Sequence, residues 1–297
     1  MCRWGEAWVL GPNINAAMED DAVAPAFAAA AQASALADVA DGASALERDL
    51  IAAMAERYAL AADADRAALD LAFADAMVAV AAAHRDRPTV QALAAEALMN
   101  TQPWDYWEAD GVTPKGRADE ILAHLERALD LDAEHPGAAH LYIHAVEASA
   151  EPERAEPYAD RLGDAMPAAG HLVHMPSHIY YRVGRYIDSL EANRAAVAAD
   201  ERFFEQLPRG DGIYAYGYYP HNVHFLLVSA QMAGAADDAL AAAEKLERVM
   251  SDDAAERWGW VQAIETAPYT AHAQFSTPET ILALEDPGER FPFVRAF

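Results

Sequence analysis

Alanine-rich apolar runs alternate with short polar segments along most of this chain. Runs such as residues 28–31 and 79–83 contain only alanine and valine, so they combine high helix propensity with side chains small enough for helices to pack closely. Residues 72–83 and 88–100 read as two such helices. We find no run of strictly alternating apolar and polar residues, which a half-buried strand would show. We therefore expect an all-α protein without a β-sheet.

One segment carries a more specific pattern than helix propensity. Residues 179–196 contain an aromatic first helix, the turn Gly184-Arg-Tyr186 and a second helix with small residues at packing positions. This pattern resembles the tetratricopeptide repeat. Ala155 lies 34 residues before Ser189 in an equivalent second helix, which is the length of one repeat.

The repeat continues in both directions. A further 34-residue step back from Ala155 reaches Ile121, in another expected second helix. Gly234 repeats the turn 50 residues after Gly184, so we expect an insertion of 16 residues in the aromatic stretch 203–219.

Together these steps predict one tetratricopeptide-like, right-handed α-helical solenoid over residues 1–297, built from antiparallel helix pairs. Residues 275–284 are expected to form a partial repeat. The chain starts inside an expected helix, residues 1–10, and ends at residues 293–297 without a capping helix. We therefore expect a fragment of a longer protein.

The composition narrows the classes of partner. Of 297 residues, 54% are apolar, and the formal net charge is −27. The sequence lacks the clustered Lys and Arg residues that nucleic-acid binding requires. The single cysteine, Cys2, excludes a disulfide framework and any site with several thiolates. No run approaches the roughly 18 consecutive apolar residues of a membrane span. We expect a cytoplasmic protein that binds neither nucleic acid nor membranes.

The histidines form the strongest chemical signal. Seven of the eleven lie in three short segments, each the expected first helix of a repeat. Counted from Pro136, Gly170 and Pro220, they share offsets of one, four and eight residues. Stacked repeats place equivalent positions side by side, so we expect rows of imidazoles across neighbouring helices. The seven are His140, His144, His171, His174, His178, His221 and His224.

These rows predict a metal site. Residues three or four apart share one face of a helix, and neighbouring helices pack roughly 8–10 Å apart, so imidazoles from two helices can reach one ion. A lone histidine is usually a surface or core residue, but seven in register are not explained in that way. We predict that all seven ligate a transition metal ion, Cu, Fe or Zn, and that Glu147 is catalytic. The remaining histidines that lack these offsets, His84, His124, His135 and His272, are interpreted as structural.

Several blocks resemble a bacterial family of longer tetratricopeptide proteins with histidine-rich helices. They include Trp4-Gly5, residues 95–100, 103–107, 170–178 and 219–225, and the resemblance covers nearly the whole chain. It implies that the histidines and Glu147 line a concave groove, where a small molecule or a peptide binds. It implies no particular reaction. The aromatic stretches 104–107 and 214–219 are expected to roof that groove.

Two classes of function remain open from the sequence. The first is a metal-dependent enzyme, with a dinuclear redox site as the leading form because so many imidazoles exceed the needs of one ion. A zinc-dependent hydrolase with Glu147 as base is its alternative, although no H-E-x-x-H element supports it. The second is a tetratricopeptide scaffold that binds a peptide or protein partner in the groove.

Overall fold

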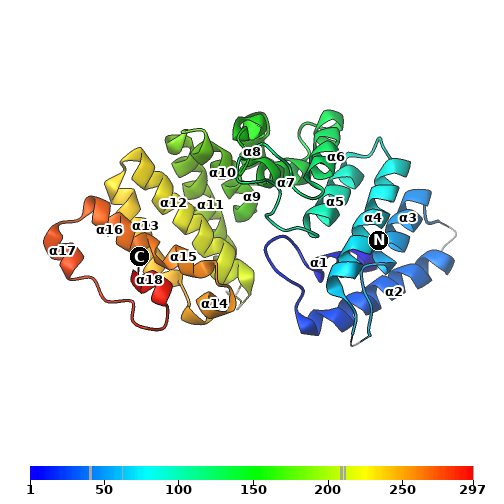
Figure 1. Ribbon diagram of the computed structural model, residues 1–297, viewed down its shortest axis with the longest axis horizontal. Coiled ribbons are helices and arrows are strands. Elements are labelled where there is room, and N and C mark those ends of the chain that lie inside the picture. Colours follow the sequence, from blue (N-terminus) through cyan, green and yellow to red (C-terminus); the bar gives the residue numbers. More distant parts are fainter. Residues whose placement is uncertain (40–41, 62, 208–209, 211, 297) are drawn as a thin grey trace. The chain divides into compact units, whose positions relative to one another are not determined.

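The chain folds entirely into helices and connecting loops. The computed structural model describes residues 1–296 apart from 40, 41, 62, 208, 209 and 211, and these residues contain no β-strand. Two isolated bridges, Asn13 with Ala16 and Trp107 with Pro114, are the extended pairings within this part of the chain. The prediction of an all-α protein is confirmed. The helices form two compact units, Met1–Glu151 and Pro152–Phe297 (Figure 1).

The first unit is built around α5 (Pro88–Met99), which packs against its neighbours on three sides. Most of its side chains are buried, including Ala94, Ala95 and Leu98, because alanine lets the surrounding helices approach its backbone. The other helices of this unit are α1 (Cys2–Val9), α2 (Val23–Val39), α3 (Ala45–Ala55), α4 (Arg66–Ala83), α6 (Ala118–Leu131) and α7 (Pro136–Val146), with the short 3₁₀ helix η1 (Asp20–Ala22) before α2.

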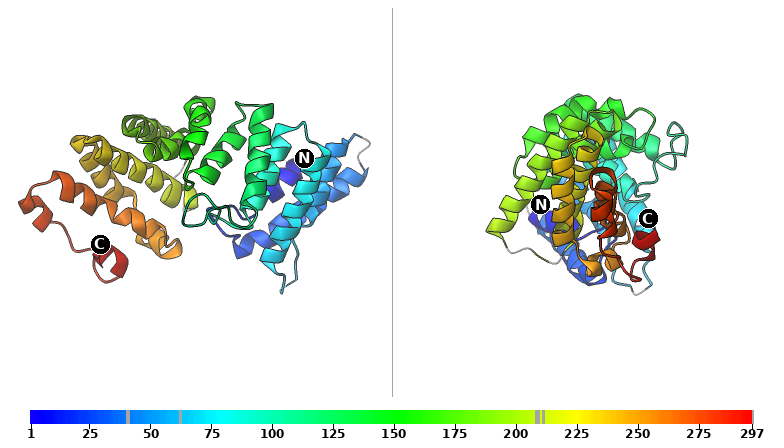
Figure 2. Two further views of the ribbon diagram at one scale, coloured as in Figure 1. Left: turned by 45° about the horizontal axis from the view of Figure 1, so that its top comes forward. Right: turned by 90° about the vertical axis from the view of Figure 1, so that its left-hand side faces the viewer.

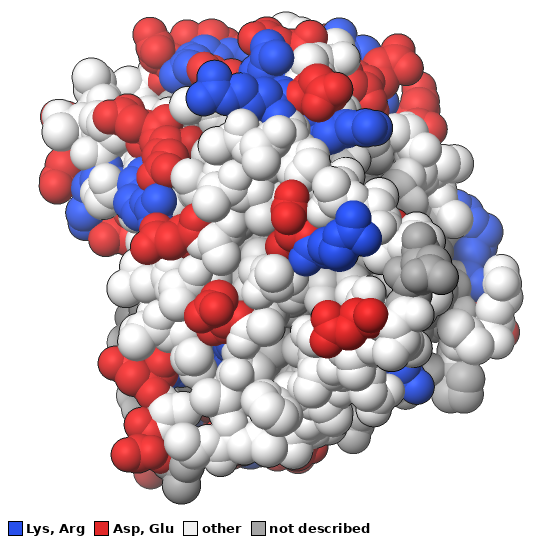
Figure 3. All heavy atoms as spheres, turned by 90° about the vertical axis from the view of Figure 1, so that its right-hand side faces the viewer, with Lys and Arg blue, Asp and Glu red and all other residues white. Residues whose placement is uncertain are grey.

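The segment Asp20–Val39, which contains α2, is long and apolar enough by composition to cross a membrane. Only 22% of its apolar window is buried in the structure, and Figure 3 shows few charged side chains over the lower part of the face where α2 lies. The sequence analysis expected no run of consecutive apolar residues long enough to span a membrane. That expectation holds for uninterrupted runs, since Gln32 and Ser34 interrupt the segment Asp20–Val39. A core helix of a soluble protein and a signal sequence pass the same test, so the segment is weak evidence for a membrane.

The second unit has its core between α11 (Tyr186–Gln206), α12 (Tyr219–Ala233) and α13 (Ala236–Val249), which lie side by side in Figures 1 and 2. Leu190, Val223 and Leu246 come from these three helices and are fully buried in one cluster. The remaining elements are η2 (Pro152–Ala155), α8 (Glu156–Ala165), α9 (Gly170–His174), α10 (Pro176–Arg182), η3 (Tyr214–Tyr218), α14 (Asp252–Arg257), α15 (Val261–Glu265), α16 (Ala267–Phe275), α17 (Pro278–Leu282) and α18 (Pro292–Ala296).

Two turns of the second unit have the same construction, as their spacing predicts. Gly184 follows α10 and Gly234 follows α12, with φ angles of +82° and +72° that glycine adopts without steric cost. In both, the amide after the glycine donates to a carbonyl five residues earlier, Arg185 to Tyr180 and Ala235 to Ala230. The predicted equivalence of these two turns is confirmed.

A proline separates the two short helices that carry three of the histidines. Met175, between α9 and α10, keeps helical φ and ψ of −51° and −39°, but Pro176 has no amide to donate. The chain therefore continues in the same direction with a break in its hydrogen bonds. Residues on either side of the break remain spaced as on one helix.

The expected insertion forms a distinct local structure. Tyr214–Tyr218 is a π-helix that leads directly into α12, and π-helical turns are frequent at functional sites. Pro208, Arg209 and Asp211, which belong to the insertion expected from the sequence, lie outside the described residues.

Candidate metal centre

Three histidines of the second unit form one cluster. His174 ends α9, His178 lies one turn further along in α10, and His221 lies in the first turn of α12. The ring centroids of His174 and His178 are 4.7 Å apart, and that of His221 lies 4.8 Å from His174 and 5.5 Å from His178. The packing of α9 and α10 near α12 thus brings residues 43 and 47 positions apart into direct contact.

The Nε2 atoms of this cluster converge. Nε2 of His178 lies 2.9 Å from Nε2 of His174 and 3.5 Å from Nε2 of His221. Two nitrogens bound to one tetrahedral metal at about 2.0–2.1 Å are separated by about 3.3 Å. These two separations lie on either side of that value, and all three ligand atoms lie within 4.8 Å of one another. The structure therefore contains a histidine triad that could hold a metal ion.

A buried asparagine fixes the tautomer of His174. Asn193 of α11 donates its Nδ2 hydrogen to the Ser189 carbonyl at 2.8 Å, which leaves its Oδ1 atom facing His174. Nδ1 of His174 lies 2.6 Å from that oxygen, and an amide oxygen only accepts, so Nδ1 carries the proton. The Nε2 lone pair of His174 is thereby directed into the cluster, as a metal ligand requires.

The cluster is largely shielded from water. His174 is fully buried and His178 is 6% exposed. Burial, together with the neighbouring His174 and His178, lowers the pKa of His221 well below its ordinary value. The Phe225 ring covers one side, with its centroid 4.5–4.9 Å from those of all three imidazoles. A neutral imidazole is the form that binds metal.

A buried carboxyl group braces the helices that carry the cluster. Asp200 of α11 is 1% exposed, and it accepts hydrogen bonds from Tyr214 of the π-helix at 2.6 Å and Asn222 of α12 at 2.8 Å. Burial raises the pKa of Asp200. A Cβ atom on Gly170, the first residue of α9, would lie 1.9 Å from Oδ1 of Asp200. Asp200 therefore sets the distance between the start of α9 and the start of α12.

The remaining predicted ligands of the second unit lie beside the triad. His171 has its ring 6.1 Å from that of His174 and 4.8 Å from that of Tyr218. His224 is one helical turn beyond His221, with its ring 6.2 Å from that of Phe225, and burial lowers its pKa to about 4. Among the described residues, His224 belongs to no group of converging ligand atoms within this unit.

The first unit carries its own pair of predicted ligands. His140 and His144 face each other one turn apart on α7, with ring centroids 4.9 Å apart. Nδ1 of His144 lies 2.9 Å from Oε1 of Glu147, which orients the imidazole of His144. The Trp104 ring packs edge-on against His144 at 4.9 Å, and Trp104 adopts a φ of +64°, a strained backbone for a bulky residue. The aromatic segment expected to roof the site thus contacts His144.

Each histidine interpreted as structural has a local partner. His84 lies 2.7 Å from an oxygen of Asp49, and Nδ1 of His135 accepts from the Ala138 amide at the start of α7. Nδ1 of His272 lies 2.8 Å from Oγ of Ser276, and Nδ1 of His124 lies 2.8 Å from Oε1 of Gln91. These contacts give each of the four histidines a role in the fold that requires no metal ion.

Three residues of the centre escaped the sequence analysis: Asn193, Asp200 and Phe225. Asn193 and Asp200 are polar residues in the interior of a long helix, where asparagine and aspartate are poor helix formers. That local conflict was the available signal. It does not identify a partner, because the partner helix is contributed by a distant part of the chain.

Comparison with known proteins does not assign the chain to a family. No family model matches it, and no curated protein matches it. The resemblance to tetratricopeptide proteins therefore stays a prediction.

Proposed function

We propose that this chain is a metalloprotein whose transition metal ion is held by His174, His178 and His221. The observation that carries the proposal is the convergence of their Nε2 atoms around a common point, with distances of 2.9 and 3.5 Å. Within the cluster, Nε2 of His174 accepts from Nε2 of His178, and a metal ion would take the place of that shared proton. The hydrogen bond to Asn193, which protonates Nδ1 of His174, further supports a ligand role.

The donor set favours a catalytic over a structural site. Structural zinc sites are closed by four protein ligands, usually including cysteine, whereas catalytic sites keep a position open for water or substrate. The triad supplies three neutral ligands and no thiolate. An ion held in this way retains its full positive charge and an open coordination position, which suits a Lewis acid or a redox centre.

The metal that the centre selects decides between two reaction classes. Imidazole suits Cu, Fe, Zn and Ni. With Cu or Fe the centre would be that of an oxidoreductase. With Zn it would activate water for hydrolysis.

A second ion is part of this proposal. His140, His144 and Glu147 offer two imidazoles and a carboxylate in the first unit, where Glu147 orients His144. We propose that these residues contribute to a second metal-binding position, with Glu147 as a carboxylate partner. Two metal ions per chain are the expected result when both positions are occupied.

We also propose that the helices stack as a tetratricopeptide-like solenoid whose concave face carries the histidines and takes a small-molecule or peptide ligand. The 34-residue spacing of His140 and His174 supports this arrangement. The equivalent turns at Gly184 and Gly234 support it independently.

Metal analysis of protein purified without chelator tests the proposal. We expect at least one transition metal ion per chain, and His178→Ala or His221→Ala should lose that ion. His272→Ala is the matched control, because His272 lies in the same unit and, among the described residues, bonds to Ser276 one turn along the chain. Wild-type protein that binds none of Cu, Fe, Zn or Ni, or equal metal loss in His178→Ala and His272→Ala, would overturn it.

A further inference from the structure

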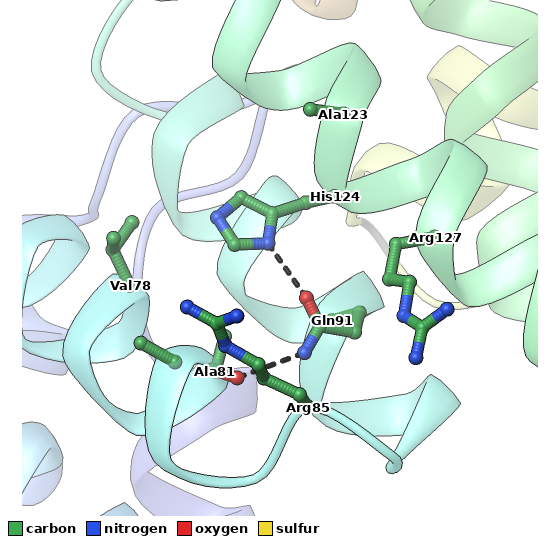
Figure 4. Close-up of a pocket in the computed structure, with 8 residues that line it drawn as sticks. Val78, Ala81, Arg85, Gln91, Ala123, His124 and Arg127 are labelled. Carbon is green, nitrogen blue, oxygen red and sulfur yellow. Dashed lines mark hydrogen bonds between the residues drawn. The ribbon is translucent and has the colours of Figure 1, made fainter.

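A pocket with four polar side chains lies in the first unit, apart from the metal ligands. It has a volume of about 350 Å³ and lies between the C-terminal end of α4, the first turn of α5 and the middle of α6 (Figure 4). Its floor is formed by Val78 and alanine side chains. Its polar groups are Arg85, Gln91, His124 and Arg127. The volume falls at the lower end of the range of small-molecule sites.

Two of the polar groups are held in fixed orientation. Gln91 is 3% exposed and donates its Nε2 hydrogen to the Ala81 carbonyl at 2.9 Å, so its Oε1 atom must act as an acceptor. Nδ1 of His124 lies 2.8 Å from that oxygen and therefore carries the proton. Nε2 of His124 points away from Gln91 in Figure 4 and is left as an acceptor. Burial lowers the pKa of His124, which keeps the ring neutral at pH 7.

The two arginines carry unbalanced positive charge. In a chain with 48 acidic residues and 21 Lys and Arg residues, most arginines are expected to have a carboxylate partner. Within the described part of the chain, neither Arg85 nor Arg127 forms an ion pair, and no acidic side chain lines the pocket. Their guanidinium groups flank Gln91 in Figure 4. Each guanidinium presents a planar fork of N–H donors, which matches a bidentate oxyanion.

We propose that this pocket binds the oxyanion group, phosphoryl or carboxylate, of a small molecule. Arg85 and Arg127 supply the charge, and the apolar floor accommodates the adjoining carbon atoms. His124 Nε2 accepts a hydrogen bond from a protonated oxygen or a neighbouring hydroxyl of the same ligand. Gln91 acts as a positioning residue, because it contacts His124 and the backbone of α4. This site does not depend on the metal centre.

Titration with inorganic phosphate and with succinate tests the site and separates its two sources of oxyanion. The full chain is stripped of metal with EDTA, dialysed into chelator-free buffer and titrated by calorimetry at constant ionic strength, so that binding to a metal ion makes no contribution. We expect saturable binding of at least one of the two anions, weakened at least tenfold in the double variant Arg85→Gln, Arg127→Gln. A response to phosphate alone assigns a phosphoryl ligand, and a response to succinate alone assigns a carboxylate.

The variant Arg48→Gln is the matched control, since Arg48 is an exposed arginine of the same unit that, among the described residues, bonds to the Ala43 carbonyl. It should bind the anions as the wild type does. Both pocket arginines are exposed, so the double variant should keep the wild-type melting temperature without anion. Absence of saturable binding of both anions, or equal weakening in Arg48→Gln and in the double variant, would overturn the proposal.

Discussion

At the scale of single residues, the chemistry of the triad depends on which nitrogen of each imidazole carries a proton. His174 is the clearest case, because Asn193 offers an oxygen at 2.6 Å that can only accept. The sequence could single out the histidines of the triad as candidate ligands, since their repeat offsets set them apart from the histidines interpreted as structural. The orientation of the His174 ring could not, because it depends on Asn193 of α11 and Phe225 of α12.

Asn193→Ala should weaken metal binding without removing a ligand. The loss of the acceptor frees the His174 ring to rotate and to change tautomer, and loss of such a partner typically costs 10–100-fold in metal affinity. Asn193→Asp keeps an acceptor oxygen and should retain most of the affinity. Competition with a chromophoric chelator measures both. Equal affinities for wild type and Asn193→Ala would show that Asn193 does not position His174.

Gly170→Ala should destabilise the second unit, because the new Cβ atom would lie 1.9 Å from Oδ1 of Asp200. We expect a loss of about 1–3 kcal/mol in the free energy of unfolding, as for other overpacked buried sites. Gly163→Ala in α8 is the matched control. Its Cβ would meet Pro176 at an ordinary 3.8 Å, so that variant should be neutral or slightly more stable. Urea unfolding of the two variants measures the difference. Equal free energies of unfolding for Gly170→Ala and Gly163→Ala would show that Asp200 does not fix the position of Gly170.

At the scale of helices, counting offsets predicted which segments carry ligands but not the rotation of each helix about its axis. By offset, His174 is equivalent to His224, whereas the structure places His221 in the triad. The two positions are three residues apart and therefore about 60° apart around α12. That rotation is set by the π-helix before α12 and by the bond from Asn222 to Asp200. Neither the π-helix nor this hydrogen bond can be predicted from the repeat pattern of the sequence.

The turn after α12 should tolerate only residues that accept a left-handed backbone. Gly234 has φ of +72° with open space around its Cα, so any penalty for substitution is conformational. Gly234→Ala should lower the free energy of unfolding by about 1–2 kcal/mol. Gly234→Asn should lose less, because asparagine enters this region more readily. Thermal melts of both variants measure the difference, and an alanine variant as stable as the asparagine variant would contradict this account of the turn.

Glu265 of α15 should make stability depend on pH. Burial, assisted by the nearby Asp252, raises its pKa from 4.5 to about 7. Between these two values the unfolded chain has released a proton that the folded chain retains, so stability falls as the pH rises from 4.5 to 7. Above pH 7 the penalty is constant. The carboxyl group is only half-buried, so solvent screening reduces the effect.

Glu265→Gln should therefore raise the melting temperature by a few degrees at pH 8 and change it little near pH 4. Glu153→Gln, at an exposed position of the same unit, should change it at neither pH. A gain for Glu265→Gln that is the same at pH 4 and pH 8 would exclude titration of Glu265 as the cause.

At the scale of the whole molecule, the all-α class followed directly from alanine-rich runs and the absence of alternating residues. The sequence also placed two equivalent glycine turns correctly. The division into two compact units was not visible, because no change of composition marks the chain near Glu151. The pocket around Gln91 was not visible either, since its four polar residues come from three separate segments and share no offset.

The net charge of −27 is consistent with a protein that attracts cations over its whole surface, yet the proposed ion is held by neutral imidazoles. Transition metals, not Mg²⁺ or Ca²⁺, should therefore occupy the triad, because hard cations prefer oxygen ligands. Nitrogen ligands thus provide the selectivity that surface charge does not.

X-ray absorption spectroscopy of the metal-loaded chain tests the central claim most directly, because it reports the atoms bound to the ion. Three imidazole nitrogens at about 2.0–2.1 Å, in a shell that His272→Ala leaves unchanged, are the predicted result, and His221→Ala should lose the ion together with its imidazole scattering. A first shell of oxygen atoms without imidazole scattering, or a shell unaffected by His221→Ala, would contradict a metal centre at His174, His178 and His221.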